Sequence, residues 1–134
     1  MFTPLRYDAG MITTIKDGTA SSTTITKFDA LDWSSGYLQR ATSGATIVRY
    51  VAMEDVTTAA GEHEDIQVLY VDGVEFECDT AGNTSAALRG TFLDLTDHDT
   101  INQAASNTNV FYCTEIIGAA ADKKVRGYFL MNIA

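Results

Sequence analysis

Short apolar segments separated by turn residues dominate this 134-residue chain, and this pattern constrains its fold more than any other feature. No segment keeps an apolar period of 3.6 residues over several turns, whereas alternation with a period of two is typical of strands. The predicted strands are Met11 to Lys16, Thr23 to Phe28, Gly36 to Ala41, Thr46 to Met53, Asp65 to Val71, Val74 to Asp79, Gly90 to Leu95, Val110 to Ile117 and Lys124 to Met131. The sequence therefore predicts an all-β fold.

At most one short helix fits among these strands. A Thr or Asp side chain can accept hydrogen bonds from the first turn of a helix, so Thr96 and Asp97 predict a helix that ends near Ala105. Eight or nine strands in a chain of this length favour one small β-barrel or sandwich. We expect a single β domain over residues 11–134, preceded by an extended N-terminal arm over residues 1–10.

The dipeptide Asp72-Gly73 lies between two β-rich segments and predicts a hairpin with a two-residue type I′ turn. Such a turn would place one set of side chains on a core face, namely Gln67, Leu69, Val71, Val74, Phe76 and Cys78. The opposite face would carry Ile66, Val68 and Tyr70 beside Glu75, Glu77 and Asp79. This mixed face either meets a partner or is an ordinary exposed strand face with a few aliphatic residues.

The chain is strongly acidic, with a net charge of −9 from 9 Lys and Arg against 18 Asp and Glu. This charge would repel phosphate backbones and anionic membrane surfaces, so we expect neither nucleic acid nor membrane as a partner. No apolar run approaches the roughly 18 residues of a spanning helix, and Met1 to Gly10 lacks the regions of a signal peptide. These features predict a soluble, unsecreted protein.

Acidic and basic residues are segregated along the chain. The segment from Glu54 to Asp99 contains many acidic residues and a single basic residue, Arg89. Near the C-terminus the basic residues form a group of Lys123, Lys124 and Arg126. A head-to-tail contact between identical subunits would bring the two charge groups together. Solvated acidic loops are the alternative interpretation.

No motif of the sequence indicates catalysis. The chain has no Gly-rich phosphate loop, no GxSxG elbow and no HExxH. His63 and His98 lie inside acidic runs, but contiguous residues on a strand point to opposite faces and do not converge on one metal ion. Cys78 and Cys113 lack metal or redox spacing, so we expect buried free thiols. We therefore expect no enzyme activity, no metal and no cofactor.

The N-terminal stretch is more apolar than a solvated tail needs to be. An extended arm that docks on a neighbouring molecule fits this composition, and a loose end or a first edge strand are the alternatives. The predicted interface for a partner molecule or a second subunit comprises Phe2, Thr3, Pro4, Leu5, Arg6, Tyr7, Ile66, Val68, Tyr70, Lys123, Lys124 and Arg126.

Over most of its length the chain resembles the head decoration, or capsid cement, proteins of tailed bacteriophages. The resemblance rests on the order of five segments: residues 25–33 (ITKFDALDW), 35–41 (SGYLQRA), 48–56 (VRYVAMEDV), 74–78 (VEFEC) and 124–130 (KVRGYFL). Two features depart from the family pattern. Phe28 stands where the family has a glycine after the early lysine, and the acidic loop over residues 61–65 has no counterpart.

The resemblance implies a small β-barrel-like fold of the β-tulip type. It also implies a homotrimer that binds the major capsid protein on the outer surface of the virion and stabilises the shell, after synthesis in the host cytoplasm. Two other classes remain open. One is another virion β-barrel component, such as a tail tube, connector or fibre protein. The other is a small carbohydrate-binding module, for which Trp33, Tyr37 and Tyr50 are the suggestive aromatic residues.

Overall fold

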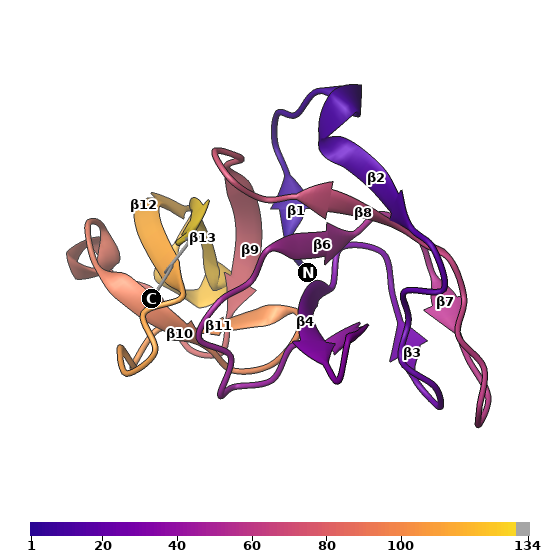
Figure 1. Cartoon of the computed structure of the whole chain (residues 1–134). Coiled ribbons are helices and arrows are strands. Elements are labelled where there is room, and N and C mark those ends of the chain that lie inside the picture. The colour runs from indigo at the N-terminus through magenta and orange to yellow at the C-terminus, as the bar shows by residue number, and fades with distance from the viewer. Residues whose placement is uncertain (131–134) are drawn as a thin grey trace.

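The computed structural model describes residues 1–130, in which strands form two larger sheets and one two-stranded sheet (Figure 1). The first sheet has the order β1 (Thr3–Pro4), β9 (Phe76–Thr80), β11 (Thr100–Asn102), β10 (Phe92–Leu95), β12 (Phe111–Ile117) and β13 (Lys124–Phe129). The second has the order β2 (Ile12–Ile15), β8 (Ile66–Tyr70), β6 (Tyr50–Ala52), β4 (Ala30–Ser34) and β5 (Tyr37–Arg40). The third pairs β3 (Thr24–Ile25) with β7 (Val56–Thr57).

Helical structure within residues 1–130 is limited to three single 3-10 turns, which are η1 (Ala9–Met11), η2 (Ala86–Leu88) and η3 (Ala120–Asp122). None of them has the length or the apolar character of a helix that crosses a bilayer. The predicted all-β class is therefore confirmed. The last predicted strand ends at Phe129, and Met131, which we included in it, lies outside the described residues.

The first sheet closes into a small barrel. β13 pairs with β12 on one side and with β9 on the other, so β9, β11, β10, β12 and β13 form a ring. The pairing of β11 with β9 is parallel, and the other pairings in the ring are antiparallel. Closure matters because an open sheet edge can pair with another chain. The barrel-like architecture that the sequence predicted is present in this half of the molecule.

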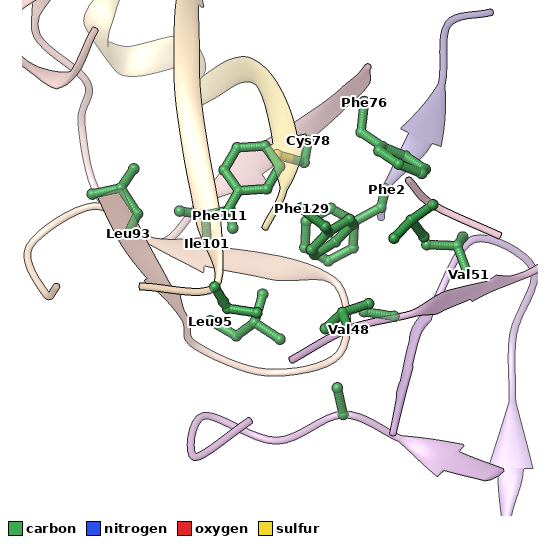
Figure 2. Packing of buried hydrophobic residues seen from close by; sticks show 14 of the residues in the cluster. Phe2, Val48, Val51, Phe76, Cys78, Leu93, Leu95, Ile101, Phe111 and Phe129 are labelled. Atoms are coloured by element: carbon green, nitrogen blue, oxygen red, sulfur yellow. The ribbon is translucent and has the colours of Figure 1, made fainter. Parts of the chain in front are cut away.

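Aromatic rings fill the barrel (Figure 2). The ring centroid of Phe129 lies 5.2 Å from that of Phe76 and 5.4 Å from that of Phe111. Gly127 allows this packing, because a Cβ there would collide with the Tyr112 carbonyl oxygen and the Phe111 ring. Smaller buried residues complete the core, among them Cys78, Leu93, Leu95, Ile101, Val110, Cys113 and Val125.

The second sheet separates two apolar clusters. On one face, Ala30, Val51 and Leu69 pack with the barrel core. The other face carries a second cluster of Ile25, Leu31, Leu38, Ala52, Ile66 and Val68. The Leu38 N–H donates to Gly18 O (2.6 Å) and the Ala20 N–H donates to Leu38 O (2.8 Å), which ties the segment after β2 to β5.

The predicted hairpin between β8 and β9 is wrong, although the chain does turn there. The Val74 N–H donates to Val71 O (3.0 Å), and Gly73 has a φ of 76° whereas Asp72 does not have a positive φ. A type I′ turn needs positive φ at both central residues, and one positive φ at the second position is typical of a type II turn. Type II turns splay the flanking strands, and β8 and β9 accordingly enter different sheets.

Two residues of β8 that we expected at an interface are core residues instead. Ile66 and Val68 are fully buried in the second cluster, whereas Tyr70 at the end of the strand is 38% exposed. The reason is that β8 leaves the hairpin for the second sheet, both faces of which are covered near its middle. Of this predicted group, Tyr70 alone remains available to a partner.

The start of the N-terminal segment packs within its own chain, which corrects the prediction of an extended arm that docks on a neighbour and agrees with the alternative of a first edge strand. Phe2 is fully buried, with its ring centroid 4.9 Å from that of Phe129 and 6.2 Å from that of Phe111. Thr3 and Pro4 form β1, which adds to β9, and Pro4 is buried. The large apolar surface of Phe2 thus finds its burial within its own chain. The residues after Pro4 return to the surface.

The helix predicted from Thr96 to Ala105 is also wrong. The Thr96 N–H donates to Thr100 O (2.8 Å), so β10 and β11 form a tight antiparallel connection. The Asp97 carboxylate accepts from the Asp99 N–H (3.0 Å). Asp side chains satisfy nearby backbone groups in turns as well as at helix starts, and here the turn is formed.

The two cysteines are free and buried, as predicted. Burial raises the pKa of the Cys78 thiol well above its usual range. Burial also raises the pKa of the Cys113 thiol, which is directed to Glu115 O at 3.8 Å. Both thiols are therefore protonated at neutral pH and shielded from reagents.

Candidate interaction surface

A hollow of about 630 Å³ lies where the N-terminal segment leaves the core, and we call it the N-terminal groove. Its lining residues are Leu5, Arg6, Tyr7, Asp8, Met11, Gly73 and Val74. The Leu5 N–H donates to Glu75 O (2.9 Å), which fixes the chain against the start of β9. Tyr7 is 43% exposed, so a large aromatic side chain stands at the rim. Three predicted interface residues, Leu5, Arg6 and Tyr7, are brought together here.

Three aromatic side chains from neighbouring strands form a second feature, which we call the aromatic row. Trp33 of β4 meets Tyr50 of β6 edge to face, with ring centroids 6.0 Å apart and an interplanar angle of 84°. Tyr50 in turn lies 6.1 Å from Tyr70 of β8 at an angle of 57°. Trp33 is 43% exposed and Tyr50 is half-buried. These rings lie at the uncovered end of the face that carries the second cluster.

The N-terminal groove and the aromatic row both lie near the end of β8 that carries Tyr70. Met11 lines the groove and directly precedes β2, whose first residue Ile12 pairs with Leu69 of β8. Tyr70 follows Leu69, and the turn that carries Gly73 comes next. Both features therefore lie near this end of β8, the groove on the side of the barrel core and the aromatic row on the face of the second cluster.

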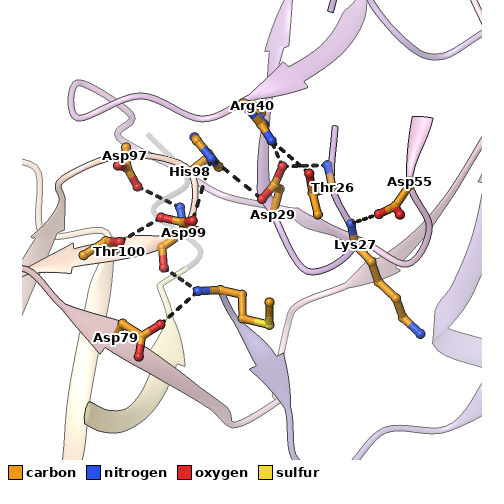
Figure 3. Close-up of polar contacts among 11 residues, drawn as sticks. Thr26, Lys27, Asp29, Arg40, Asp55, Asp79, Asp97, His98, Asp99 and Thr100 are labelled. Carbon is orange, nitrogen blue, oxygen red and sulfur yellow. Dashed lines mark hydrogen bonds and ion pairs between the residues drawn. The ribbon is translucent and has the colours of Figure 1, made fainter. Parts of the chain in front are cut away.

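A buried carboxylate joins the two larger sheets. Asp29, which is 3% exposed, accepts from Arg40 Nε and from the Thr26 N–H, each at 2.8 Å (Figure 3). His98 Nε2 lies 3.9 Å from the other oxygen of Asp29, and the Ala30 N–H donates to His98 O (2.8 Å). The Asp29 carboxylate is therefore hydrogen-bonded within its own chain. The bond from the Ala30 N–H to His98 O anchors the β10–β11 connection to β4. We assign this cluster a structural role.

The basic residues near the C-terminus find acidic partners in the same chain. Lys124 Nζ lies 2.7 Å from Asp79 Oδ1, and Arg126 Nε lies 3.8 Å from Glu77 Oε1, both between β13 and β9. Burial alone would raise the pKa of Asp79, but the bond from Lys124 and the nearby Met1 amino group hold this pKa below its usual value. The same bond raises the pKa of Lys124.

These ion pairs correct our argument for a head-to-tail contact between subunits. Lys124 and Arg126 pair across β9 and β13 because these strands close the barrel. Lys123 is exposed, with its carbonyl accepting from the Thr80 N–H (2.8 Å). Two of the three basic residues near the C-terminus are therefore paired with acidic residues of their own chain, Asp79 and Glu77. The charge pattern of the sequence no longer favours a contact between subunits.

A second buried carboxylate fixes the loop that leads into β12. Asp94, which is 5% exposed, accepts from the backbone N–H groups of Asn107 (2.9 Å), Thr108 (2.8 Å) and Asn109 (3.0 Å). Burial would raise the pKa of Asp94, but these three donors together hold it below its usual value. The sequence did not reveal this loop anchor, since its donors are backbone groups.

The two histidines occupy separate places. His63 Nδ1 lies 2.7 Å from Thr19 O, and its ring stacks on Tyr37 with centroids 3.8 Å apart. His98 lies with Asp29 and Asp99, at 3.9 Å from each. Among residues 1–130, no group of three His, Cys, Asp or Glu side chains is arranged to hold a metal ion. The stacked rings of His63 and Tyr37 hold the loop before β8 against β5.

One exposed aromatic pair lies away from this surface and was missed in the sequence. Phe92 of β10 is 46% exposed and lies 5.3 Å from Tyr112 of β12, its partner in the strand register. Phe92 also lines a smaller hollow of about 200 Å³. The strand pattern did suggest alternation at Gly90 to Leu95, but it did not show which side faces solvent.

Comparisons of the chain with protein-family models, with curated proteins and with solved structures found no match. The surface described above and the resemblance of the sequence segments therefore carry the functional argument.

Proposed function

We propose that this protein is a structural component of a phage virion that binds the outer surface of the capsid and stabilises the shell. The observation that carries the proposal is the exposure of large aromatic side chains near one end of β8, at the N-terminal groove and in the aromatic row. Tyr and Trp supply large, rigid contact area at a small cost in side-chain entropy, and they are enriched in protein interfaces. The resemblance to decoration proteins supports the same role.

The expected affinity of one subunit is modest. Full burial of a large apolar side chain stabilises a complex by roughly 1.5–3 kcal/mol, so a side chain already half-covered contributes about 1 kcal/mol. Contacts of this size suffice when they are repeated over a shell, because linked copies rebind at high effective concentration. A homotrimer on the capsid belongs to the proposal and is supported by the resemblance alone.

The test is binding to empty capsids assembled from the major capsid protein of the same phage genome. We expect the wild-type protein to sediment with the capsids and the double variant Tyr7→Ala/Tyr70→Ala to bind at least tenfold more weakly, which is about 1.4 kcal/mol. Phe92→Ala is the matched control, because it removes an equally exposed aromatic side chain from another place. Equal binding by the double variant and the wild-type protein would refute the proposed surface. Absence of wild-type binding would refute the decoration role.

Carbohydrate binding is the second candidate, because the aromatic row exposes Trp33 and Tyr70. The ring angles of 84° and 57° argue against it, since a flat sugar-stacking platform needs rings that face solvent in one plane. Trp33 is the single tryptophan of the chain, so its fluorescence reports directly on the row. A saturable change on adding oligosaccharides, abolished in Tyr70→Ala, would favour a glycan ligand over a capsid.

A further inference from the structure

β2 is an edge strand with an open outer side. Among the strands within residues 1–130 it pairs with β8 alone, and Figure 1 shows it at the rim of the second sheet. Its middle residues Thr13 and Thr14 are exposed. The outer side of such a strand presents peptide groups that can accept a further strand.

The hydrogen bonds of β8 determine which peptide groups of β2 point outward. Gln67 O accepts from the Met53 N–H (2.9 Å), so the odd-numbered residues of β8 face β6. Peptide groups alternate sides along an antiparallel strand, and the even-numbered residues of β8 therefore face β2. Their partners in the register are Thr13 and Ile15. It follows that the peptide groups of Ile12 and Thr14 point away from β8.

Four outward groups on β2 and its following residue are free. The Ile12 N–H already donates to Ala9 O within η1. The Ile12 carbonyl, the Thr14 N–H, the Thr14 carbonyl and the Lys16 N–H have no backbone or side-chain partner in residues 1–130. The segment Ile12-Thr13-Thr14-Ile15 also lacks the charges and prolines that usually protect an edge.

We infer that β2 pairs with β2 of a second copy of this chain, antiparallel, about a two-fold axis at Thr14. Thr14 then exchanges two hydrogen bonds with Thr14 of the partner subunit, N–H to carbonyl in each direction. The Lys16 N–H donates to the carbonyl of Ile12 of the partner subunit, and the reverse bond follows by symmetry. Thr13 lies opposite Ile15 of the partner subunit, so the second sheet continues across the axis.

The choice of a second copy rests on the self-complementarity of the free groups. A two-fold axis at Thr14 uses all four outward groups of each copy. Among the outward groups of Ile12 and Thr14, the Ile12 N–H is the one that would lack a partner in this arrangement, and Ala9 already satisfies it. The contact is much smaller than the roughly 1,200–2,000 Å² of a stable interface, so the dimer is weak and depends on concentration. The inference does not depend on capsid binding.

A charge swap at the axis tests the inference by sedimentation velocity of the full chain. Thr14→Lys and Thr14→Glu each place two like charges opposite one another, so each variant alone should dimerise at least tenfold more weakly than the wild-type protein. An equimolar mixture of the two should recover the association, because opposite charges then meet across the axis. Thr24→Lys is the matched control, since Thr24 is an exposed strand residue elsewhere, and it should associate like the wild-type protein.

A disulfide provides an independent readout. Hydrogen-bonded antiparallel residues have Cα atoms about 5.5 Å apart, within the range that a disulfide spans. Thr14→Cys should therefore form a covalent dimer under mild oxidation, whereas Thr24→Cys should not, and the buried Cys78 and Cys113 should stay silent. The inference would be overturned if Thr14→Lys and Thr14→Glu each associated as strongly as the wild-type protein. It would also be overturned if the equimolar mixture of the two failed to recover the association. Equal cross-linking of the two cysteine variants would overturn it as well.

Discussion

Replacing Phe2 with alanine tests whether the N-terminus is part of the core. The ring is fully buried, and it lies between Phe111 and Phe129, which are held in turn by the closed barrel. Phe-to-Ala changes in cores cost about 3–5 kcal/mol, and the cost is largest where the surroundings cannot collapse into the cavity. We expect a loss of about 4 kcal/mol in the free energy of unfolding. A domain has about 5–15 kcal/mol in total, so this loss is severe.

The assay is urea unfolding followed by far-UV circular dichroism and by the fluorescence of Trp33. The melting temperature should fall by roughly 10–20 °C, since 1 kcal/mol corresponds to about 3–4 °C for a domain of this size. Phe2→Leu keeps more of the volume and should lose about 1–2 kcal/mol, which provides a measurable variant if Phe2→Ala does not fold. Tyr7→Ala, at the exposed rim of the N-terminal groove, should stay within about 0.5 kcal/mol of the wild-type protein. A loss below about 1 kcal/mol for Phe2→Ala would refute the reasoning and restore the detachable arm.

Three further predictions follow from buried polar groups. Asp94→Asn should lower stability at pH 7 by about 1–3 kcal/mol, since it removes charge from an acceptor of three N–H groups. The pKa of Asp94 is depressed in the folded state, so its contribution is present above the unfolded pKa of about 3.9 and is lost as the pH falls through the folded pKa. The gap between the two proteins in acid titrations of urea unfolding should therefore close below about pH 4, and a constant gap would contradict this origin. Arg40→Met should cost about 2–4 kcal/mol, because it leaves the buried Asp29 carboxylate without its cation; an unchanged urea midpoint would contradict that role. Cys78 and Cys113 should react with Ellman's reagent only as the protein unfolds, and rapid labelling of the native protein would show that they are accessible.

Most long strands could be predicted from the sequence because their apolar residues face a core on at least one side. The strand at Val110 to Ile117, for example, appears as β12 over Phe111–Ile117. β4 was missed because Asp32 and two serines interrupt its pattern near Trp33. The two-residue strands β1 and β7 are too short to give any periodicity, and tertiary pairing alone defines them. β3 lies inside the predicted strand Thr23 to Phe28 but covers only Thr24–Ile25.

The errors have a common physical origin in choices that local sequence leaves open. Asp72-Gly73 is compatible with several turn types, and the observed φ values select the type that sends β8 and β9 apart. Phe2 could bury its ring in a partner or in its own barrel with equal gain from the hydrophobic effect. The candidate surface was predicted in part, through Leu5, Arg6, Tyr7 and Tyr70. The meeting of Trp33, Tyr50 and Tyr70 needed the strand order of the second sheet.

The closed ring of strands also sets the order of events during synthesis. β1 adds to β9, and β9 completes the ring with β13, while Phe2 packs against Phe129 at the far end of the described chain. The barrel cannot close until residues 124–129 have left the ribosome, so β1 and β9 wait until β13 has been synthesised. Contacts of such wide sequence separation slow folding to the millisecond-to-second range typical of β topologies. We therefore expect one cooperative folding step after β13 has been synthesised, rather than growth from the N-terminus.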